Sequence, residues 1–228
     1  MGTLYIVSTP IGNLKDITLR SLETLKSVDY ILAEDTRVTG KLLKNYEIDA
    51  KMVSFNDFNE ESRIGQVIID LTVGKSIALV SDAGTPLVSD PGFKLVREAI
   101  KAQIRVESIP GSSAVIAALT ISGLPPDKFL FLGYLPKKEI KRRKLLTSLF
   151  TILQSMEVNK LRPNVILYES PHRILRTMKD IKDIFGNIHI VIAKELTKLH
   201  EEVIRGSIMK VIILLENKPV RGELTILF

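Results

Sequence analysis

Short apolar runs alternate with longer amphipathic stretches along the first half of the chain. Short apolar runs bounded by turn residues are typical of buried strands, whereas apolar positions three or four residues apart indicate helices. Strands that alternate with helices predict a parallel sheet covered by helices on both faces. The pattern predicts strands at 3–8, 29–33, 52–54, 77–81 and 104–108, with helices at 17–27, 36–45, 60–73, 90–101 and 112–121.

The second half of the chain has a different order of elements. Two consecutive predicted strands, 188–195 and 200–205, indicate an antiparallel pair and therefore a mixed sheet. Gly123-Leu124-Pro125-Pro126 is a candidate link, so we expect an α/β domain over 1–122 and a second over 123–228. The other strands of this half are predicted at 129–132, 163–168 and 222–228, and the helices at 137–156, 170–185 and 207–215.

The segment 77–92, IALVSDAGTPLVSDPG, is the most informative part of the sequence. It predicts a buried strand that ends in a loop, and ligands of open α/β sheets bind beyond such strand ends. Gly84 allows close approach of the backbone to a ligand, and the Asp82 carboxylate accepts hydrogen bonds. Asp90 is predicted to cap a helix that has Pro91 at its first position, and Ser170-Pro171 has the same pattern.

Similar polar loops follow six predicted strands in all. One such loop is more often a capped turn than a binding site, but six in one chain favour a site. The loops are 9–14, 33–37, 81–86, 110–113, 168–173 and 193–198.

Composition excludes several kinds of site. The chain has no cysteine and three widely spaced histidines, so we expect no metal centre. It has neither GxGxxG nor GxxxxGK[ST], which argues against a dinucleotide Rossmann site and a P-loop. It has no signal-like segment and no apolar run of membrane-spanning length, so we expect a cytoplasmic protein without a membrane partner.

The positive charge is concentrated in one segment. The net charge is +6, and residues 137–144, KKEIKRRK, carry six cations and one Glu, which leaves +1 for the remaining chain. Such a segment is either a solvated helix end or a polyanion contact. Pro136 predicts that a helix begins here, where cations oppose the helix dipole and a phosphate backbone would offset that effect.

Seven stretches in sequence order resemble the tetrapyrrole-methylase superfamily. Within it they are most similar to the bacterial branch that 2′-O-methylates a cytidine of small-subunit ribosomal RNA. The stretches are 2–18, AEDTR at 33–37, 78–92, IPGSSA at 109–114, 123–136, YESPHR at 168–173 and AKELTKLHEE at 193–202.

The resemblance implies two α/β domains, the first with a parallel sheet and the second with a mixed sheet, with S-adenosylmethionine in a cleft between them. It also implies a homodimer and 16S ribosomal RNA as the substrate, within the small subunit. The implied cofactor residues are Pro10, Gly12, Asp82, Ala83, Gly84, Pro86, Ser112, Ser113, Ala114, Tyr168, Ala193 and Leu196. The RNA contacts expected from the substrate-side loops and the basic segment are Arg37, Lys137, Lys138, Lys141, Arg142, Arg143, Lys144, His172 and Arg173.

The chain departs from the family pattern at three places. Val38 replaces a histidine that often follows AEDTR, and 55–60 reads FNDFNE where relatives commonly resemble FHEHNE. Many relatives also continue beyond the strand at 222–228 into a small helical domain. We therefore expect RNA affinity or target choice to differ from those relatives.

A ribose hydroxyl is a poor nucleophile, so a positioned base would accelerate methyl transfer. The candidates are Asp35, Glu169 and Glu195, each beside a cation, and Glu169 is preferred because Ser170-Pro171 places it at a helix start. A carboxylate beside a cation is more often a structural ion pair, and alignment alone is an alternative. Two other functions remain open, a corrin-type tetrapyrrole methylase and a non-catalytic RNA-binding module.

Overall fold

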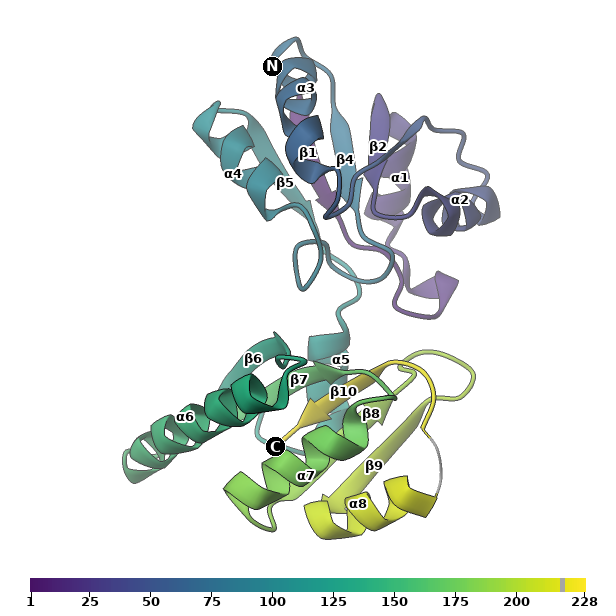
Figure 1. The fold of residues 1–228 in the computed structure, drawn as a ribbon. Coiled ribbons are helices and arrows are strands. Elements are labelled where there is room, and N and C mark those ends of the chain that lie inside the picture. The colour runs from purple at the N-terminus through teal and green to yellow at the C-terminus, as the bar shows by residue number, and fades with distance from the viewer. Residues whose placement is uncertain (218–219) are drawn as a thin grey trace. The chain divides into compact units, whose positions relative to one another are not determined.

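The protein consists of two α/β units, Met1–Ser113 and Ala114–Phe228, in a computed structural model that describes residues 1–217 and 220–228 (Figure 1). Each unit has its own five-stranded sheet and its own hydrophobic core. The expected combination of a parallel sheet followed by a mixed sheet is confirmed.

The first unit is built on a sheet in the order β3-β2-β4-β1-β5. All its strand pairs are parallel, as the alternation of strands and helices predicted. β2 and β4 are buried along their whole length, which is typical of strands covered on both faces. The strands are β1 (Thr3–Val7), β2 (Tyr30–Ala33), β3 (Met52–Ser54), β4 (Ile77–Val80) and β5 (Arg105–Ile109).

Helices cover both faces of this sheet. Side chains of a strand alternate between faces, and accordingly Leu32 belongs to the same core cluster as Val67, whereas Ile31 belongs to that of Leu25. α3 and α4 therefore lie on one face, and α1 and α2 on the other. The helices are the short 3-10 helix η1 (Leu14–Asp16), α1 (Leu19–Ser27), α2 (Thr36–Asn45), α3 (Glu60–Thr72) and α4 (Phe93–Lys101).

The second unit has a mixed sheet in the order β6-β7-β10-β8-β9. β6 and β7 are parallel, and the other pairs are antiparallel, including the predicted β8–β9 pair. α6, α7 and α8 contribute to one core cluster with β7, β8 and β10. The strands are β6 (Phe129–Tyr134), β7 (Asn164–Glu169), β8 (His189–Lys194), β9 (Glu202–Ser207) and β10 (Leu224–Leu227); the helices are α5 (Ala114–Ser122), α6 (Glu139–Val158), α7 (Ile174–Phe185) and α8 (Ile208–Asn217).

The boundary between the units lies before α5, earlier than the predicted boundary between residues 122 and 123. α5 packs against β8 and β10. Arg205 of β9 also donates hydrogen bonds to the Ile121 and Ser122 carbonyls at its end. These contacts join α5 to the second unit, and the Gly-Pro segment after it is a loop within that unit.

The predicted helix starts at Asp90-Pro91 and Ser170-Pro171 are wrong by three or four residues. α4 begins at Phe93 with Gly92 at the N-cap, and the Gly92 N–H donates to Glu60 Oε1 over 3.1 Å. α7 begins at Ile174, after a turn in which the Ser170 carbonyl accepts the Arg173 and Ile174 N–H groups. Both prolines lie in a turn that precedes the helix, so neither Asp90 nor Ser170 is an N-cap.

Within the described ranges, no helix has the length and apolar content needed to cross a membrane.

Candidate functional site

Backbone hydrogen bonds join two loops at the carboxyl edge of the first sheet. Thr9, after β1, donates its N–H to the Gly84 carbonyl over 2.9 Å, and the Gly84 N–H donates to the Thr9 carbonyl over 3.1 Å. The Ser8 hydroxyl donates to Thr85 Oγ1, which donates to the Ser112 carbonyl, each over 3.1 Å. Loops after β1, β4 and β5 are therefore held together, as the strand ends of a parallel sheet predicted.

Two glycines make this arrangement possible. Gly84 has a φ of +81°, and a Cβ there would lie 3.1 Å from Ile11 Cγ2. A Cβ on Gly111 would lie 2.9 Å from the Ser8 Cβ, closer than side chains pack. The close packing of the loops therefore requires glycine at both positions.

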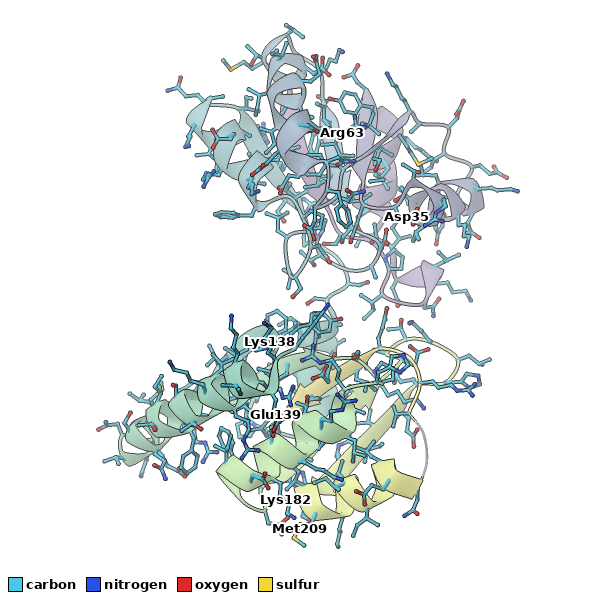
Figure 2. All side chains as sticks on the ribbon, viewed as in Figure 1. Asp35, Arg63, Lys138, Glu139, Lys182 and Met209 are labelled. Carbon is cyan, nitrogen blue, oxygen red and sulfur yellow. The ribbon has the colours of Figure 1, made fainter. Side chains whose placement is uncertain are left out.

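Carboxylates join the loops after β2 and β4, and Figure 2 labels one of them, Asp35. The Asp35 N–H donates to Asp82 Oδ1 over 3.0 Å, and the Asp82 N–H donates to Glu34 Oε2 over 3.2 Å. Asp35 also caps α2 by accepting the Arg37 N–H over 2.8 Å. Each loop thus uses a carboxylate to fix the backbone of its neighbour.

The acid groups here divide into two kinds. Hydrogen bonds from Arg37 lower the pKa of Asp35 to about 2. Loss of water contact raises the pKa of Glu34, Asp82 and Asp90. The pKa of Asp90 rises to about 7, because the effect of burial is increased by the negative charge of Glu34. The carboxyl edge is therefore a place where negative charge is crowded, and a bound cation would be stabilised there.

The cofactor residues predicted in the first unit lie in these loops. Asp82, Gly84 and Ser112 belong to the hydrogen-bonded arrangement, whereas Gly12 is exposed and Pro86 is buried. Asp90 was missed as a site residue because Pro91 suggested a helix cap. The remaining predicted residues of these loops are Pro10, Ala83 and Ser113.

The predicted cofactor residues of the second unit lie on three different elements and one loop. Tyr168 is on β7 and stacks edge-on with Phe131, with ring centroids 4.9 Å apart. Ala193 is buried on β8, and Leu196 is buried in the loop that follows. Ala114 is the first residue of α5. Their role in cofactor binding stays a prediction.

Glu169 does not have the environment predicted for a catalytic base. Its side chain is 1% exposed, Oε1 accepts the Ser170 N–H over 2.8 Å, and Oε2 accepts the Thr177 hydroxyl over 2.5 Å. The Arg173 guanidinium lies 3.3 Å from Oε1 and donates to the Leu135 carbonyl over 2.7 Å. Glu169 and Arg173 therefore stabilise the YESPHR turn, and the catalytic role of Glu169 and the RNA contact of Arg173 stay predictions.

Glu195 is also held by its surroundings. Its Oε1 accepts the Glu223 N–H and the Lys198 ammonium, each over 2.9 Å, and these hydrogen bonds lower its pKa. A Cβ at Gly222 would overlap the Glu195 carboxyl group. Glu195 thus ties the loop after β8 to the chain that enters β10.

The basic segment at the start of α6 contains two kinds of cation. Arg142 is buried and donates to Asp180 Oδ2 over 2.6 Å, and Arg143 donates to Asp180 Oδ1 and to Asp183. The Arg142 side chain is 5% exposed, and its expected phosphate contact stays a prediction. The lysines of the segment are exposed and form no ion pair within the described parts of the chain: Lys137, Lys138, Lys141 and Lys144.

Two other predicted RNA contacts lie in or just before helices, Arg37 in the first turn of α2 and His172 before α7. Arg37 is 86% exposed and pairs with Asp35, and His172 is exposed in the turn before α7. No cluster of three His, Cys, Asp or Glu side chains suited to a metal ion occurs among residues 1–217 and 220–228.

The fold and loops define a class of protein, and comparison with known proteins identifies it. The sequence model of the Tetrapyrrole (Corrin/Porphyrin) Methylases matches residues 3–212. The chain belongs to this methyltransferase family.

Named relatives within the family are similar over nearly the whole chain. Ribosomal RNA small subunit methyltransferase I of Thermotoga maritima is 46% identical over 99% of this chain and 97% of its own length. The proteins of that name from Halalkalibacterium halodurans and Bacillus subtilis are 46% and 44% identical, over 97% and 98% of this chain and 74% and 73% of their own length.

Solved structures with little sequence similarity share the fold. Diphthine synthase matches with a TM-score of 0.70 at 14% identity, over 100% of this chain and 90% of its own. A cobalt precorrin-4 methyltransferase matches with a TM-score of 0.67 at 18% identity, over 99% of this chain and 93% of its own. These two names describe different reactions, so the fold alone does not identify a substrate.

The buried ion pair at the start of α6 gives a first prediction. Arg142→Met leaves Asp180 with one cation instead of two in a buried position, so the free energy of unfolding should fall by about 3 kcal/mol. Arg162→Gln removes an exposed pair with Glu157 and should change it by less than ~1 kcal/mol. Urea unfolding of both variants measures the difference. If Arg142→Met is as stable as the wild type but binds RNA more weakly, Arg142 instead contacts RNA.

Proposed function

We propose that the protein transfers a methyl group from S-adenosylmethionine to the 2′-oxygen of a cytidine ribose in 16S ribosomal RNA. The observation that carries the proposal is the 46% identity to a small-subunit ribosomal RNA methyltransferase over nearly the full length of both chains. A corrin-type tetrapyrrole substrate is supported by the name of the family and by the structure of a cobalt precorrin-4 methyltransferase at 18% identity, which shows the fold alone. A non-catalytic RNA-binding module would not need the linked loops of the first unit.

The carboxyl edge of the first sheet suits the cofactor. S-adenosylmethionine, when bound, supplies the methyl group of its sulfonium. Glu34, Asp82 and Asp90 offer the negative charge that favours a sulfonium and an ammonium group. The backbone at Gly84 has no side chain that would hold a ligand away.

The hydrogen bonds of the predicted bases support catalysis by alignment. Glu169 is buried, Glu195 is held by Lys198 and Glu223, and Arg37 lowers the pKa of Asp35 to about 2. A general base works best when its pKa is near the working pH. The proposal therefore assigns the rate chiefly to positioning of the ribose hydroxyl against the methyl donor.

The remaining partners follow the family resemblance. Lys137, Lys138, Lys141 and Lys144 are proposed to contact RNA phosphates, because they are exposed and carry no ion pair within the described residues. A homodimer, a small-subunit particle as the substrate and a cytoplasmic location stay predictions. Light scattering of the purified protein and methylation of free RNA against assembled subunits test the first two.

The methyl transfer itself is the direct test. Purified protein, S-adenosylmethionine with a labelled methyl group and unmethylated small-subunit RNA should give one labelled 2′-O-methylcytidine by nuclease digestion and mass spectrometry. Label on a base, or label only on a tetrapyrrole, would contradict the proposal.

Gly84→Val should prevent cofactor binding. The added side chain would press on Ile11 and strain a backbone with positive φ. At a hundredfold excess over Kd, S-adenosylhomocysteine should stabilise the wild type by about 2.7 kcal/mol, which is measured as a rise in its melting temperature. It should not stabilise the variant.

Gly74→Val is the matched control for this test. Gly74 has a φ of +102° with no atom within 4 Å of an added Cβ, so the variant carries similar backbone strain away from the loops. The control should keep its response to S-adenosylhomocysteine. An unchanged response in folded Gly84→Val would show that the loop does not hold the cofactor.

Binding of S-adenosylmethionine should strengthen as the pH rises through 7. Asp90 has a pKa of about 7, so higher pH ionises it and adds an attraction for the cationic cofactor. If the cofactor lowers that pKa by one unit, affinity should rise roughly fivefold between pH 6 and 8. Calorimetric titration measures it.

Two controls make the pH test specific. Asp90→Asn should flatten the profile, and S-adenosylhomocysteine, which lacks the sulfonium charge, should show a shallower one. A profile of equal slope in Asp90→Asn would remove Asp90 from the cofactor's surroundings.

The exposed lysines of α6 should set the salt dependence of RNA binding. Lys141→Gln with Lys144→Gln should lower the slope of log K against log salt by about 1.4, because each phosphate contact contributes roughly 0.7 on single-stranded RNA. Lys182→Gln with Lys210→Gln removes the same charge from exposed positions on α7 and α8. Equal slopes in the two double variants would contradict the assignment.

A further inference from the structure

A small pocket lies at the amino edge of the first sheet, at the opposite ends of the strands from the loops described above. It has a volume of about 190 Å³, and Val67 of α3 contributes to its apolar wall. Tyr30 is the first residue of β2, and Lys51 and Lys75 lie shortly before β3 and β4. The pocket is therefore distinct from the proposed cofactor site.

The carboxylate that lines this pocket is fully engaged. Asp70 Oδ2 accepts the Tyr30 hydroxyl over 2.9 Å, and Oδ1 accepts the Lys75 ammonium over 2.9 Å and the Gln66 amide over 3.3 Å. Burial, with the neighbouring Asp70, raises the pKa of Tyr30, so the phenol stays a neutral donor. Asp70 thus compensates Lys75 and leaves the other cations of the pocket unpaired.

Two cations of the lining have no carboxylate partner. Across residues 1–217 and 220–228, neither Lys51 nor Arg63 forms an ion pair, and Arg63 Nε is buried without a hydrogen-bond partner. Figure 2 shows Arg63 on α3. A buried charged donor without an acceptor is destabilising. Asp29, the other acid close to Tyr30, accepts the Ser76 N–H over 2.7 Å and does not line the pocket.

The lining therefore carries three cations, Lys51, Arg63 and Lys75, against the single carboxylate of Asp70. A guanidinium beside ammonium groups matches the oxygens of a phosphate. The volume is below the roughly 300 Å³ at which pockets hold whole small-molecule ligands. The ligand chemistry that fits is a single phosphoryl group.

We propose that the pocket between α3 and the amino ends of β2, β3 and β4 binds a phosphate group, with Arg63 and Lys51 as its principal ligands. The phosphate belongs either to a free phosphorylated small molecule or to the backbone of the RNA substrate. Only the second source rests on the proposed function.

The first arm of the test uses inorganic phosphate and pyrophosphate. Each anion should stabilise the wild type in a saturable way. The effect is measured as a shift in melting temperature relative to sodium chloride of equal ionic strength. Lys51→Gln with Arg63→Gln should weaken the apparent affinity at least tenfold. Lys51→Gln alone changes an exposed residue, so it keeps the test valid if the double variant does not fold.

The matched control is Arg20→Gln with Lys26→Gln. Both side chains are exposed on α1, on the other face of the sheet, and the charge removed is the same. This control should respond to phosphate as the wild type does. No saturable effect of either anion on the wild type, or the same effect in the pocket variant, would overturn the proposal.

The second arm separates the two sources. If the phosphate belongs to RNA, the pocket variant should lose about 0.7 from the salt slope of RNA binding, and the control should not. If it belongs to a small molecule, the anion effect is lost and the RNA slope stays that of the wild type. S-adenosylhomocysteine binding should be unchanged in the pocket variant, so failure of this proposal is distinguishable from failure of the proposed function.

Discussion

Parallel pairing of buried strands is the constraint on which the first unit depends. β2 and β4 are buried along their whole length between two layers of helices, and neither strand carries a charged residue. The charged groups next to β2 and β4 therefore lie beyond the ends of these strands. The loops at the carboxyl ends of β1, β2, β4 and β5 carry the hydroxyls and carboxylates, and hydrogen bonds between loops give these side chains fixed positions.

The sequence predicted this unit well because its signals are local. The apolar runs mark the strands to within one or two residues, and the residues after them are loops as expected. The helix starts were less accurate. Asp90-Pro91 has the composition of a capped helix, but the cap depends on Glu60, a residue of another helix that accepts the Gly92 N–H. Because Glu60 lies 32 residues before Gly92, the local sequence around Asp90 does not reveal this hydrogen bond.

The same reason explains why the sequence did not reveal the contacts of two candidate side chains. Arg142 lies in a segment with six cations, yet Asp180, 38 residues away, makes it a buried ion pair. Glu169 stands beside a turn that looked like a helix start, yet Thr177 and Arg173 enclose it. Whether a charged residue is free or paired depends on contacts between elements. Motif spacing predicted the loops, but only the structure separates the exposed lysines of α6 from its paired arginines.

Charge is distributed unequally over the two edges of the first sheet. Glu34, Asp82 and Asp90 crowd at the carboxyl edge, where desolvation raises each pKa. Lys51, Arg63 and Lys75 gather at the amino edge with a single carboxylate among them. One edge is therefore suited to a cation and the other to an anion, and the buried strands β2 and β4, which carry no charged residue, lie between them.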